Sequence, residues 1–358
     1  MIEAEQLEDA GGGKSRELIF LLFLCGTILV TELTSPLWAD SCVGVEGVFQ
    51  IRVDGKYGFI NRRGEVVIEP EFQNVGWFSE GYAAVQIADD RWGYINVAGA
   101  VAIEPKFQSA GEFSEGLAVA KSAATGARGY IDTSGAFVIE PRFEYARGFS
   151  EGLAAVRLKE SGKWGYINTG GSFVVEPRFI KATSFAGGLA TVVTYVRDEL
   201  LLGFIDREGE WVIAAQYVFA QDFREGVAAV LTPEGKSGFI NRDGEFVIGP
   251  RFRKARNFRE GLAPVEINGT LNFIDHEGKI VLRDVGKWDF FASGPFRSGL
   301  APVKRGDKFG YINRQGTFVI KPRFDLALPF VGGIARVEIQ DRIGYIDKKG
   351  EYVYKPSK

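Results

Sequence analysis

The feature that most restricts the fold of this 358-residue chain is a repeated Gly-aromatic-Ile triplet. The triplet occurs nine times at intervals of 34–38 residues, once with Asn in place of Gly. A period of this length is typical of arrays in which each repeat is one small unit that buries its apolar face against its neighbours. We therefore expect one tandem array. The first residues of the triplets are Gly58, Gly93, Gly129, Gly165, Gly203, Gly238, Asn272, Gly310 and Gly344.

A turn signal follows every triplet at a fixed distance. Asn or Asp stands three residues after the first position and Gly three residues further, as in Asn61 and Gly64. Asn and Asp open turns by bonding to the backbone ahead, and Gly accepts the left-handed conformation that closes them. The triplet itself, a β-branched run such as residues 66–68 and a Gly-Leu-Ala-Ala-Val run such as residues 152–156 have strand composition. Each unit is predicted to be a three-stranded β-meander.

Pairs of aromatic residues connect one unit to the next. Two aromatics stand six residues apart, and in most units a Pro two residues before the first one ends the preceding strand. Each ring can bury about 150–250 Å², so the pairs are predicted to form the core between units. The first members are Phe72, Phe107, Phe143, Phe179, Tyr217, Phe252 and Phe324, and the second members are Phe78, Phe113, Phe149, Phe185, Phe223, Phe258 and Phe330.

Together these motifs resemble the WG (KWG) repeat family. The resemblance is carried by Trp-Gly-Tyr-Ile-Asn at residues 92–96 and 164–168, by the Ile-Glu-Pro-x-Phe segments and by Phe-Ser-Glu-Gly-Leu-Ala. It covers about residues 47–356 and departs most in the seventh unit, at Asn272 and residues 283–285. The resemblance implies a β-rich array, mostly found in bacteria, often exported or attached to other domains, and generally without an assigned activity.

The sequence favours an all-β, curved open or spiral array of these units. Nine units exceed the four to eight blades usual in a β-propeller, and both end units look complete, so no blade is obviously split to close a ring. A closed β-propeller-like ring is the alternative.

The first 39 residues form a separate segment. A 13-residue apolar run at residues 18–30 follows Lys14 and Arg16, which is typical of a secretory signal with cleavage near Ala39. Thirteen residues in a helix cover about 20 Å, short of a membrane span. The alternatives are an uncleaved membrane anchor and a buried core helix. We expect a signal at residues 1–39, a short leader at 40–46, the array at 47–356, and an exported protein that is periplasmic, on the cell surface or secreted.

Composition argues against several kinds of site. The net charge of −3 becomes nearly neutral without residues 1–39, whereas nucleic-acid binding requires a basic surface. One His and two Cys leave no ligand cluster for a metal, and we expect no cofactor. A row of arginines beside the first aromatics is interpreted as stems packed over the rings with their heads in water, and a basic stripe on one face is the alternative. These are Arg142, Arg178, Arg251 and Arg323.

The reactive motifs are all repeat positions, so we expect no catalytic residues. Residues 148–152 match the G-x-S-x-G pattern of hydrolases, but Ser150 belongs to the recurring Phe-Ser-Glu-Gly element, and its one possible His partner, His276, stands in a turn. Glutamates recur at two repeat positions as structural bonds or a solvated face would, whereas a catalytic pair should be singular. They are Glu80, Glu115, Glu151, Glu225 and Glu260, and Glu69, Glu104, Glu140 and Glu176.

The least regular segments are the candidates for recognition. The insert of the seventh unit carries Trp288, Phe290 and Phe291, and the long link at residues 194–202 carries Tyr195 and Arg197. Exposed aromatics on loops often bind partners or sugars. The sequence thus favours a non-catalytic exported scaffold that binds an unknown protein or envelope glycan, with the membrane contacted only through an uncleaved N-terminal segment. An envelope polysaccharide hydrolase or lyase and a membrane-anchored interaction module are the alternatives.

Overall fold

The computed structural model describes residues 47–87, 91–288 and 294–356. All regular secondary structure in these residues is β-strand. The described residues contain no helix that is long and apolar enough to cross a membrane. They belong to one compact unit, residues 37–358. The predicted signal and leader, residues 1–46, lie outside the described residues.

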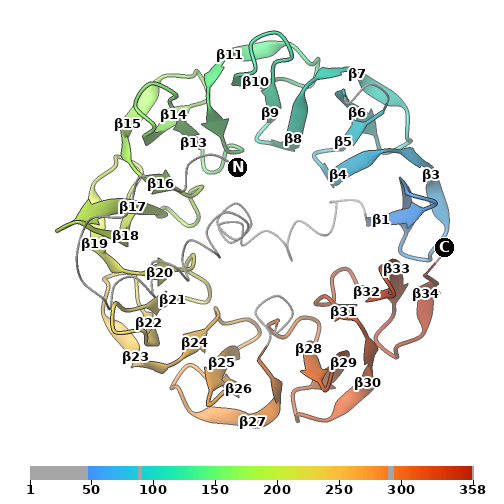
Figure 1. The fold of residues 1–358 in the computed structure, drawn as a ribbon, viewed down its shortest axis with the longest axis vertical. Coiled ribbons are helices and arrows are strands. Elements are labelled where there is room, and N and C mark those ends of the chain that lie inside the picture. The colour runs from blue at the N-terminus through green and yellow to red at the C-terminus, as the bar shows by residue number, and fades with distance from the viewer. Residues whose placement is uncertain (1–46, 88–90, 289–293, 357–358) are drawn as a thin grey trace, which may run out of the picture. The chain divides into compact units, whose positions relative to one another are not determined.

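The strands group into nine successive blades that surround a central space (Figure 1). Their bounds are β1 (Val48–Val53), β2 (Lys56–Asn61) and β3 (Val66–Phe72) in blade 1; β4 (Asn74–Ser79), β5 (Tyr82–Gln86), β6 (Trp92–Asn96) and β7 (Val101–Phe107) in blade 2; β8 (Ser109–Ser114), β9 (Leu117–Lys121), β10 (Arg128–Ile131) and β11 (Phe137–Phe143) in blade 3; β12 (Tyr145–Ala146), β13 (Leu153–Arg157), β14 (Trp164–Asn168) and β15 (Phe173–Phe179) in blade 4; β16 (Lys181–Ala182), β17 (Ala190–Val196), β18 (Glu199–Ile205) and β19 (Trp211–Tyr217) in blade 5; β20 (Phe219–Ala220), β21 (Ala228–Leu231), β22 (Ser237–Ile240) and β23 (Phe246–Phe252) in blade 6; β24 (Lys254–Ala255), β25 (Ala263–Ile267), β26 (Thr270–Ile274) and β27 (Ile280–Lys287) in blade 7; β28 (Leu300–Arg305), β29 (Lys308–Asn313) and β30 (Phe318–Phe324) in blade 8; and β31 (Leu326–Ala327), β32 (Ala335–Ile339), β33 (Arg342–Ile346) and β34 (Tyr352–Tyr354) in blade 9.

Within a blade the strands pair antiparallel in chain order, the first at the inner edge of the ring and the last at the outer rim (Figure 1). The predicted meander is confirmed, but a fourth strand precedes it in seven blades, with six residues in blades 2 and 3 and two residues in the other five. The residue midway between paired aromatics lies in this strand, and in blade 4 it is Ala146, which pairs with Val156. The Leu-Ala-x-Val strand also pairs with the triplet that follows it, so the blade boundary falls between the two aromatics of a pair.

The predicted turn is present as expected. The Oδ1 of Asn61 accepts the backbone N–H groups of Arg63 at 2.8 Å and Glu65 at 3.1 Å, and Gly64 has a φ of 81°. Equivalent bonds recur at Asn96, Asp132, Asn168, Asp206, Asn241, Asp275, Asn313 and Asp347.

The triplet glycine allows the outer strand to approach closely. The register between β14 and β15 shifts around Gly165, and a Cβ there would lie 2.4 Å from the carbonyl oxygen of Val175. In blade 7 the residue at this position is Asn272, whose Oδ1 accepts the N–H of Asp284 at 3.0 Å. Asp284 has a φ of 51°, so the blade that departs most from the sequence pattern uses a different bulge.

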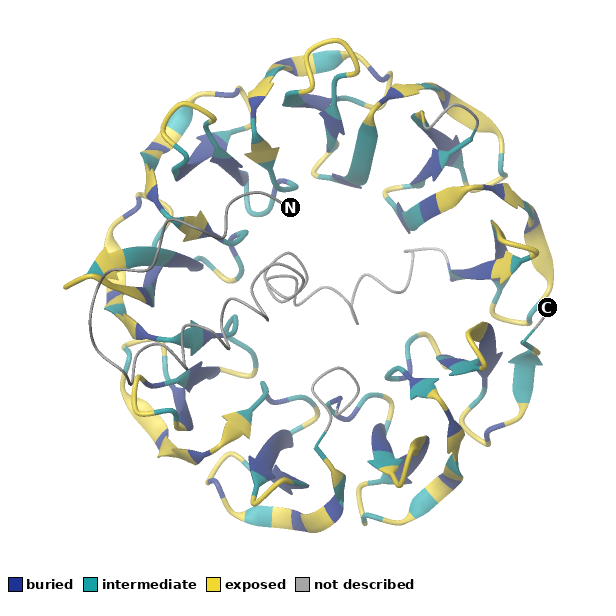
Figure 2. Ribbon diagram, in the orientation of Figure 1, coloured by how far each residue is buried: buried dark blue, intermediate teal, exposed yellow. Residues whose placement is uncertain are grey.

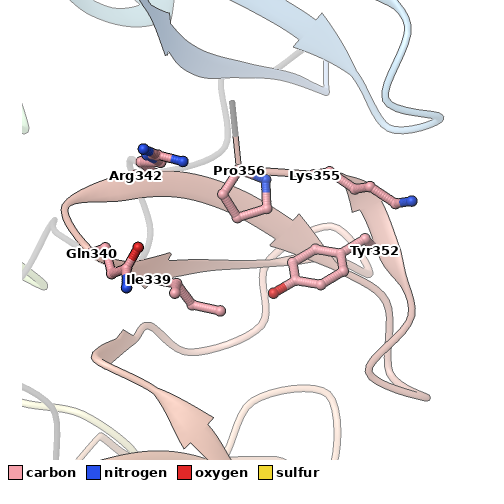
Figure 3. Close-up of a pocket in the computed structure, with 6 residues that line it drawn as sticks. All are labelled: Ile339, Gln340, Arg342, Tyr352, Lys355 and Pro356. Atoms are coloured by element: carbon pink, nitrogen blue, oxygen red, sulfur yellow. The ribbon is translucent and has the colours of Figure 1, made fainter. Parts of the chain in front are cut away.

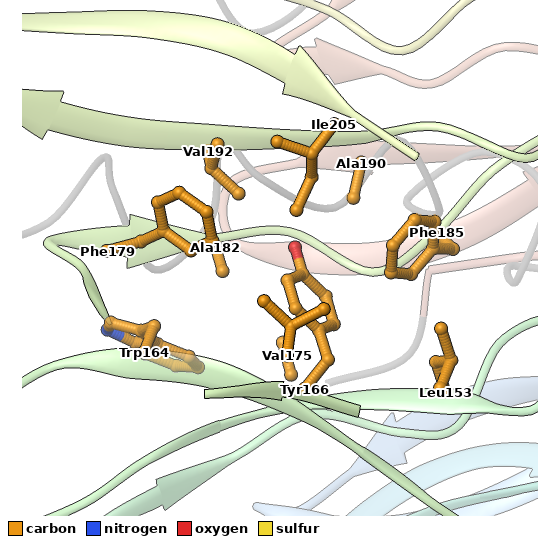
Figure 4. Packing of buried hydrophobic residues seen from close by; sticks show 11 residues of the cluster. Leu153, Trp164, Tyr166, Val175, Phe179, Ala182, Phe185, Ala190, Val192 and Ile205 are labelled. Atoms are coloured by element: carbon orange, nitrogen blue, oxygen red, sulfur yellow. The ribbon is translucent and has the colours of Figure 1, made fainter. Parts of the chain in front are cut away.

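The aromatic pairs lie in cores shared by neighbouring blades, as predicted. Between blades 4 and 5, Tyr166 and Phe185 are buried with their ring centroids 4.8 Å apart, amid Val175, Phe179 and Val192 (Figure 4). Burial is concentrated on the middle strands, whereas exposed residues lie at turns and along the outer rim (Figure 2). Each blade therefore completes its neighbour's core.

The expected all-β array of tandem units is confirmed, and its end blades meet as in the closed-ring alternative rather than in an open or spiral arrangement. Phe49 and Ile51 of blade 1 share a buried cluster with Tyr345 of blade 9. The rings of Phe49 and Tyr345 lie 5.5 Å apart, and the Tyr345 hydroxyl donates to the carbonyl oxygen of Gln50 at 2.7 Å. No described strand is exchanged between the end blades. Side-chain packing, the same device that joins internal blades, closes the ring.

Candidate functional site

The recurring glutamates of the Phe-Ser-Glu-Gly element clamp one blade to the next. The carboxylate of Glu80 accepts the backbone N–H groups of Glu115 at 2.7 Å and Gly116 at 2.9 Å. The equivalent glycine N–H of the next blade donates to each of the glutamates Glu115, Glu151, Glu225 and Glu260. Of the two interpretations left open by the sequence, structural bonds describe this position. The second set, at Glu69, Glu104, Glu140 and Glu176, is exposed on the outer strands.

The G-x-S-x-G match at residues 148–152 is likewise a repeat element. The Ser150 hydroxyl donates to the carbonyl oxygen of Phe185 in the next blade at 2.7 Å, as Ser79 and Ser114 do to Phe113 and Phe149.

His276 lies three blades away from Ser150, in a turn of blade 7. Its ring stacks on Phe258 at 4.0 Å, and its Nε2 lies 3.0 Å from Glu225. The structure does not bring Ser150 and His276 together. Among the described residues no group of three His, Cys, Asp or Glu side chains could hold a metal ion.

The arginines beside the first aromatics bond neighbouring blades as well. The Arg142 guanidinium lies 5.0 Å from the centroid of the Phe143 ring and donates to the carbonyl oxygen of Gly171 in the next blade's turn at 2.5 Å. Arg178, Arg251 and Arg323 repeat this arrangement. The side chains thus pack over the rings as interpreted, but their heads bond to the next blade instead of lying in water.

The link at residues 194–202 is an extended hairpin. Strands β17 and β18 have seven residues each, whereas the corresponding strands of other blades have four to six. Tyr195 lies opposite Leu200, and the two side chains are 58% and 46% exposed. Arg197 is exposed in the turn with a φ of 49°. This tip presents an aromatic, an aliphatic and a cationic side chain to solvent.

The insert of blade 7 has a different environment. Trp288 is half-buried and packs against the core between blades 7 and 8, which includes Phe296. Its Nε1 is buried and has no hydrogen-bond partner among the residues described. Phe290 and Phe291 lie outside the described residues. Trp288 therefore fills a packing gap, which was the alternative interpretation of this insert.

A shallow hollow of about 530 Å³ lies on blade 9 (Figure 3). Tyr352 and Ile339 form its apolar wall, and Arg342 and Lys355 supply cations beside Gln340 and Pro356. Its lining includes no carboxylate, which leaves no pair for general acid–base hydrolysis there.

A set of arginines at the inner edge of the ring was not singled out by sequence reasoning. Arg147 and Arg256 directly follow the inner strands β12 and β24, and Arg224, Arg259 and Arg297 stand in the turns to the second strands. All five are half-buried. The sequence signal that could have found them is their position in the repeat. Arg224, Arg259 and Arg297 occupy the position that holds Ser in blades 2, 3 and 4.

Two carboxyl groups share this inner edge and are held partly out of water. Burial raises the pKa of Asp222 to about 6, although the neighbouring Arg224 and Arg147 pull that pKa down. Burial also raises the pKa of Glu112, against the effect of the Trp77 backbone N–H that it accepts. Burial lowers the pKa of Arg147 as well. Asp222, Glu112 and Arg147 therefore lie in poorly solvated positions of the inner edge.

The repeat of this chain also occurs in known proteins. The family "WG containing repeat" matches residues 57–89, 92–122, 129–161, 164–194, 203–232, 238–270 and 309–342, more than half of the chain. These are seven repeats; the structure adds the blades of Asn272 and Gly344, which gives the nine predicted, with blades 7 and 8 joined into one sheet by the pairing of Lys287 with Lys304. No curated protein matches the chain.

Several solved structures are similar in fold. BamB from Moraxella catarrhalis is 14% identical, with a TM-score of 0.45 over 76% of this chain and 90% of its own. Virginiamycin B lyase from Staphylococcus aureus is 14% identical, with a TM-score of 0.36 over 58% and 81%. Hsv2 from Kluyveromyces lactis is 10% identical, with a TM-score of 0.38 over 72% and 89%. At these identities and scores, none of them carries an argument about the activity of this chain.

Proposed function

The chain belongs to the family of WG-containing repeat proteins, and from this premise we propose that it is a non-catalytic exported scaffold. It binds a protein or an envelope component through the loop tips of its ring. Its recurring polar side chains support this proposal, because they bond one blade to the next. A side chain engaged in the same structural bond at several interfaces is poorly suited to unique chemistry.

The observation that carries the proposal is the β17–β18 hairpin. Tyr195 and Leu200 are exposed side by side on strands longer than the fold requires, and Arg197 lies in the turn between them. Tyr and Arg are enriched among the residues that dominate binding energy at protein interfaces. A hairpin extended beyond its neighbours also reaches a partner without disturbing the inter-blade cores.

A pull-down from envelope extract tests this proposal. Wild type should capture a partner that Tyr195→Ala captures at least tenfold less well, because an interface anchor is worth about 2 kcal/mol or more. Val247→Ala is the matched control, since Val247 is 52% exposed on the outer strand β23 and should behave as wild type. Equal capture by all three proteins would contradict the assignment of the hairpin.

A second assay addresses the hydrolase alternative. Purified protein is incubated with envelope polysaccharides, and the release of reducing ends is measured. No turnover is expected, because the carboxylates of Glu80, Glu115 and Glu151 accept backbone N–H groups. Turnover that a single Glu→Gln change abolishes would defeat the scaffold proposal.

A further inference from the structure

A buried ring at the end of the outer strand is a regular part of the cores between blades. The first aromatic of each pair lies there, and it is at most 4% exposed at seven junctions. Between blades 4 and 5 it is Phe179, which pairs opposite Trp164 and belongs to one cluster with Val192 (Figure 4). The equivalent residues are Phe72, Phe107, Phe143, Tyr217, Phe252 and Phe324.

The core between blades 9 and 1 has no ring at this position among the described residues. Ile343 and Ile51 stand in this core at the repeat positions of Trp164 and Val192. The repeat position of the first aromatic in blade 9 is residue 358, which is Lys. A lysine is poorly suited to a place that is almost fully buried at seven other junctions.

The outer strand of blade 9 also stops pairing early. In the other eight blades the third strand pairs with the outer strand as far as the residue before the triplet. In blade 9 the pairing of β33 with β34 ends at Tyr345 and Tyr354, so no described residue of β34 lies opposite Ile343. The hollow of Figure 3 borders this place, because Arg342, which precedes Ile343, lines it together with Pro356.

Blade 1 carries an exchange of large and small residues at the same junction. At internal junctions the second aromatic contacts the triplet tyrosine, and it stands three residues before the glycine of the following turn. Three residues before Gly47 stands Gly44, and Phe49 contacts Tyr345 instead. The exchange indicates that the repeat continues upstream of Gly47. In the other eight blades the position of Phe49 holds alanine, at Ala83, Ala118, Ala154, Ala190, Ala228, Ala263, Ala301 and Ala335.

The same register identifies an aromatic residue in the leader. The first aromatic stands nine residues before the glycine of the following turn at all eight internal junctions, the eighth being Phe290. Nine residues before Gly47 stands Trp38. Pro36 precedes Trp38 by two residues, as a Pro does at six of the eight internal junctions, and Glu46 stands at the position of the clamping glutamates. Residues 36–47 therefore match the repeat at four positions.

We propose that residues 36–46 of this chain dock at the junction of blades 9 and 1, where the ring of Trp38 packs against Ile343 and Ile51. The spacing of nine residues to Gly47 equals the spacing with which Phe179 reaches the equivalent place. An indole ring buried there removes about 150–250 Å² of surface from water. Trp38 adds a side chain and not a strand, because β34 is already the outer strand of blade 9.

The inference goes beyond the scaffold function and restricts how the predicted signal is processed. Trp38 has to remain in the mature protein, so a cleaved signal ends before Pro36 and not near Ala39. A chain cut near Ala39 would lose the ring that completes the closing core.

Thermal unfolding of the full-length protein tests the docking. Trp38→Ala should lower Tm by about 5 °C, because a buried aromatic is among the most costly side chains to truncate. Leu37→Ala is the matched control and should leave Tm within about 1 °C, since its repeat position is exposed in other blades, as at Glu71. Equal Tm values for the two variants would overturn the inference.

A rescue experiment identifies the place that Trp38 occupies. Lys358→Phe installs the aromatic that other outer strands carry, so it should restore most of the Tm that Trp38→Ala loses. In the wild-type background it should raise Tm by less than about 1 °C, because Trp38 already fills the place. A rise as large in wild type as in Trp38→Ala would show that the place is open or taken by another molecule, and would overturn the inference. If Trp38→Ala does not fold, Trp38→Leu with and without Lys358→Phe gives the same comparison.

The N-terminus of the protein isolated from its host gives an independent test. Mass spectrometry should find a mature chain that begins at or before Pro36, and a chain that begins after Trp38 would contradict the inference. Neither test involves the β17–β18 hairpin, so their failure is distinguishable from failure of the scaffold proposal, which depends on Tyr195.

Discussion

At the scale of single residues, three recurring side chains join the blades. A triplet tyrosine donates its hydroxyl to a carbonyl oxygen in or directly after the next blade's inner strand. A glutamate accepts backbone N–H groups of the next blade, and an arginine reaches from its own aromatic to the next blade's turn. Tyr94, Tyr130, Tyr166 and Tyr311 donate to carbonyl oxygens at 2.7–2.8 Å, and burial raises the pKa of each. Burial therefore favours the neutral, hydrogen-bond-donating form of these tyrosines.

Removing one such hydroxyl should destabilise the protein measurably. Tyr166→Phe leaves the carbonyl oxygen of Thr183 without this donor in a buried site, which costs about 1–2 kcal/mol. The free energy of unfolding is measured by urea denaturation. Tyr195→Phe is the control and should change nothing, because Tyr195 is 58% exposed. A destabilisation equal in both variants would contradict the role assigned to the Tyr166 hydroxyl.

Asp222 should make stability depend on pH. Its pKa is about 6 in the folded protein, above the ordinary value of 3.8, so the folded state binds the proton more tightly. Its contribution to stability is therefore full below pH 4 and is lost as the pH rises through 6. Asp222→Asn should remove this loss, and its advantage over wild type should grow between pH 4 and pH 7 in urea denaturation. A constant difference across that range would contradict the assignment.

At the scale of elements, the blade depends on one backbone approach. The triplet glycine lets the outer strand bulge against the third strand, and eight of the nine triplets keep it. In blade 7 the two strands pack in a different way, because the side-chain Oδ1 of Asn272 accepts a hydrogen bond from the N–H of Asp284.

A methyl group at this approach should be costly. Gly165→Ala places a Cβ 2.4 Å from the carbonyl oxygen of Val175, which forces the strands apart and should cost about 2–4 kcal/mol of unfolding free energy. Gly249→Ala is the matched control on β23, where a Cβ would meet no atom within 4 Å. Thermal unfolding distinguishes them: the first should lower Tm by several degrees, and equal Tm values would refute the packing argument.

The elements were largely predictable because their signals are local. Asn61 and Gly64 define a turn by themselves, and the spacing of Phe143 and Phe149 marks a shared core. The inner strand was missed because in most blades it has only two residues, such as Tyr145 and Ala146, which are too few to show a period-2 pattern.

The candidate site was less predictable for related reasons. Tyr195 is exposed, as a loop aromatic was expected to be, whereas Trp288 packs against a core. Whether an aromatic in an irregular segment faces water or a neighbouring blade depends on contacts distant in sequence. The inner arginines required knowledge of which strand lies innermost.

At the scale of the whole molecule, the ring closes without a shared blade. Blade 1 uses strands from the beginning of the described chain and blade 9 strands from its end, and Phe49, Ile51 and Ile60 meet Ile334, Ile343 and Tyr345 between them. Closure was not predictable from the end units, because a complete blade can join a ring or terminate an array. An end blade closes the ring when its outer face packs against the aromatic residues of another blade.

The most direct test of this closure is a double-mutant cycle between Phe49 and Tyr345. The free energy of unfolding is measured for Phe49→Leu, Tyr345→Leu and the double variant, with Tyr130 and Phe149 as an internal pair whose centroids lie 4.8 Å apart. A closed ring predicts a coupling of about 1 kcal/mol for both pairs, since the rings of Phe49 and Tyr345 are in contact. Additive effects at Phe49 and Tyr345, beside a clear coupling in the internal pair, would contradict closure.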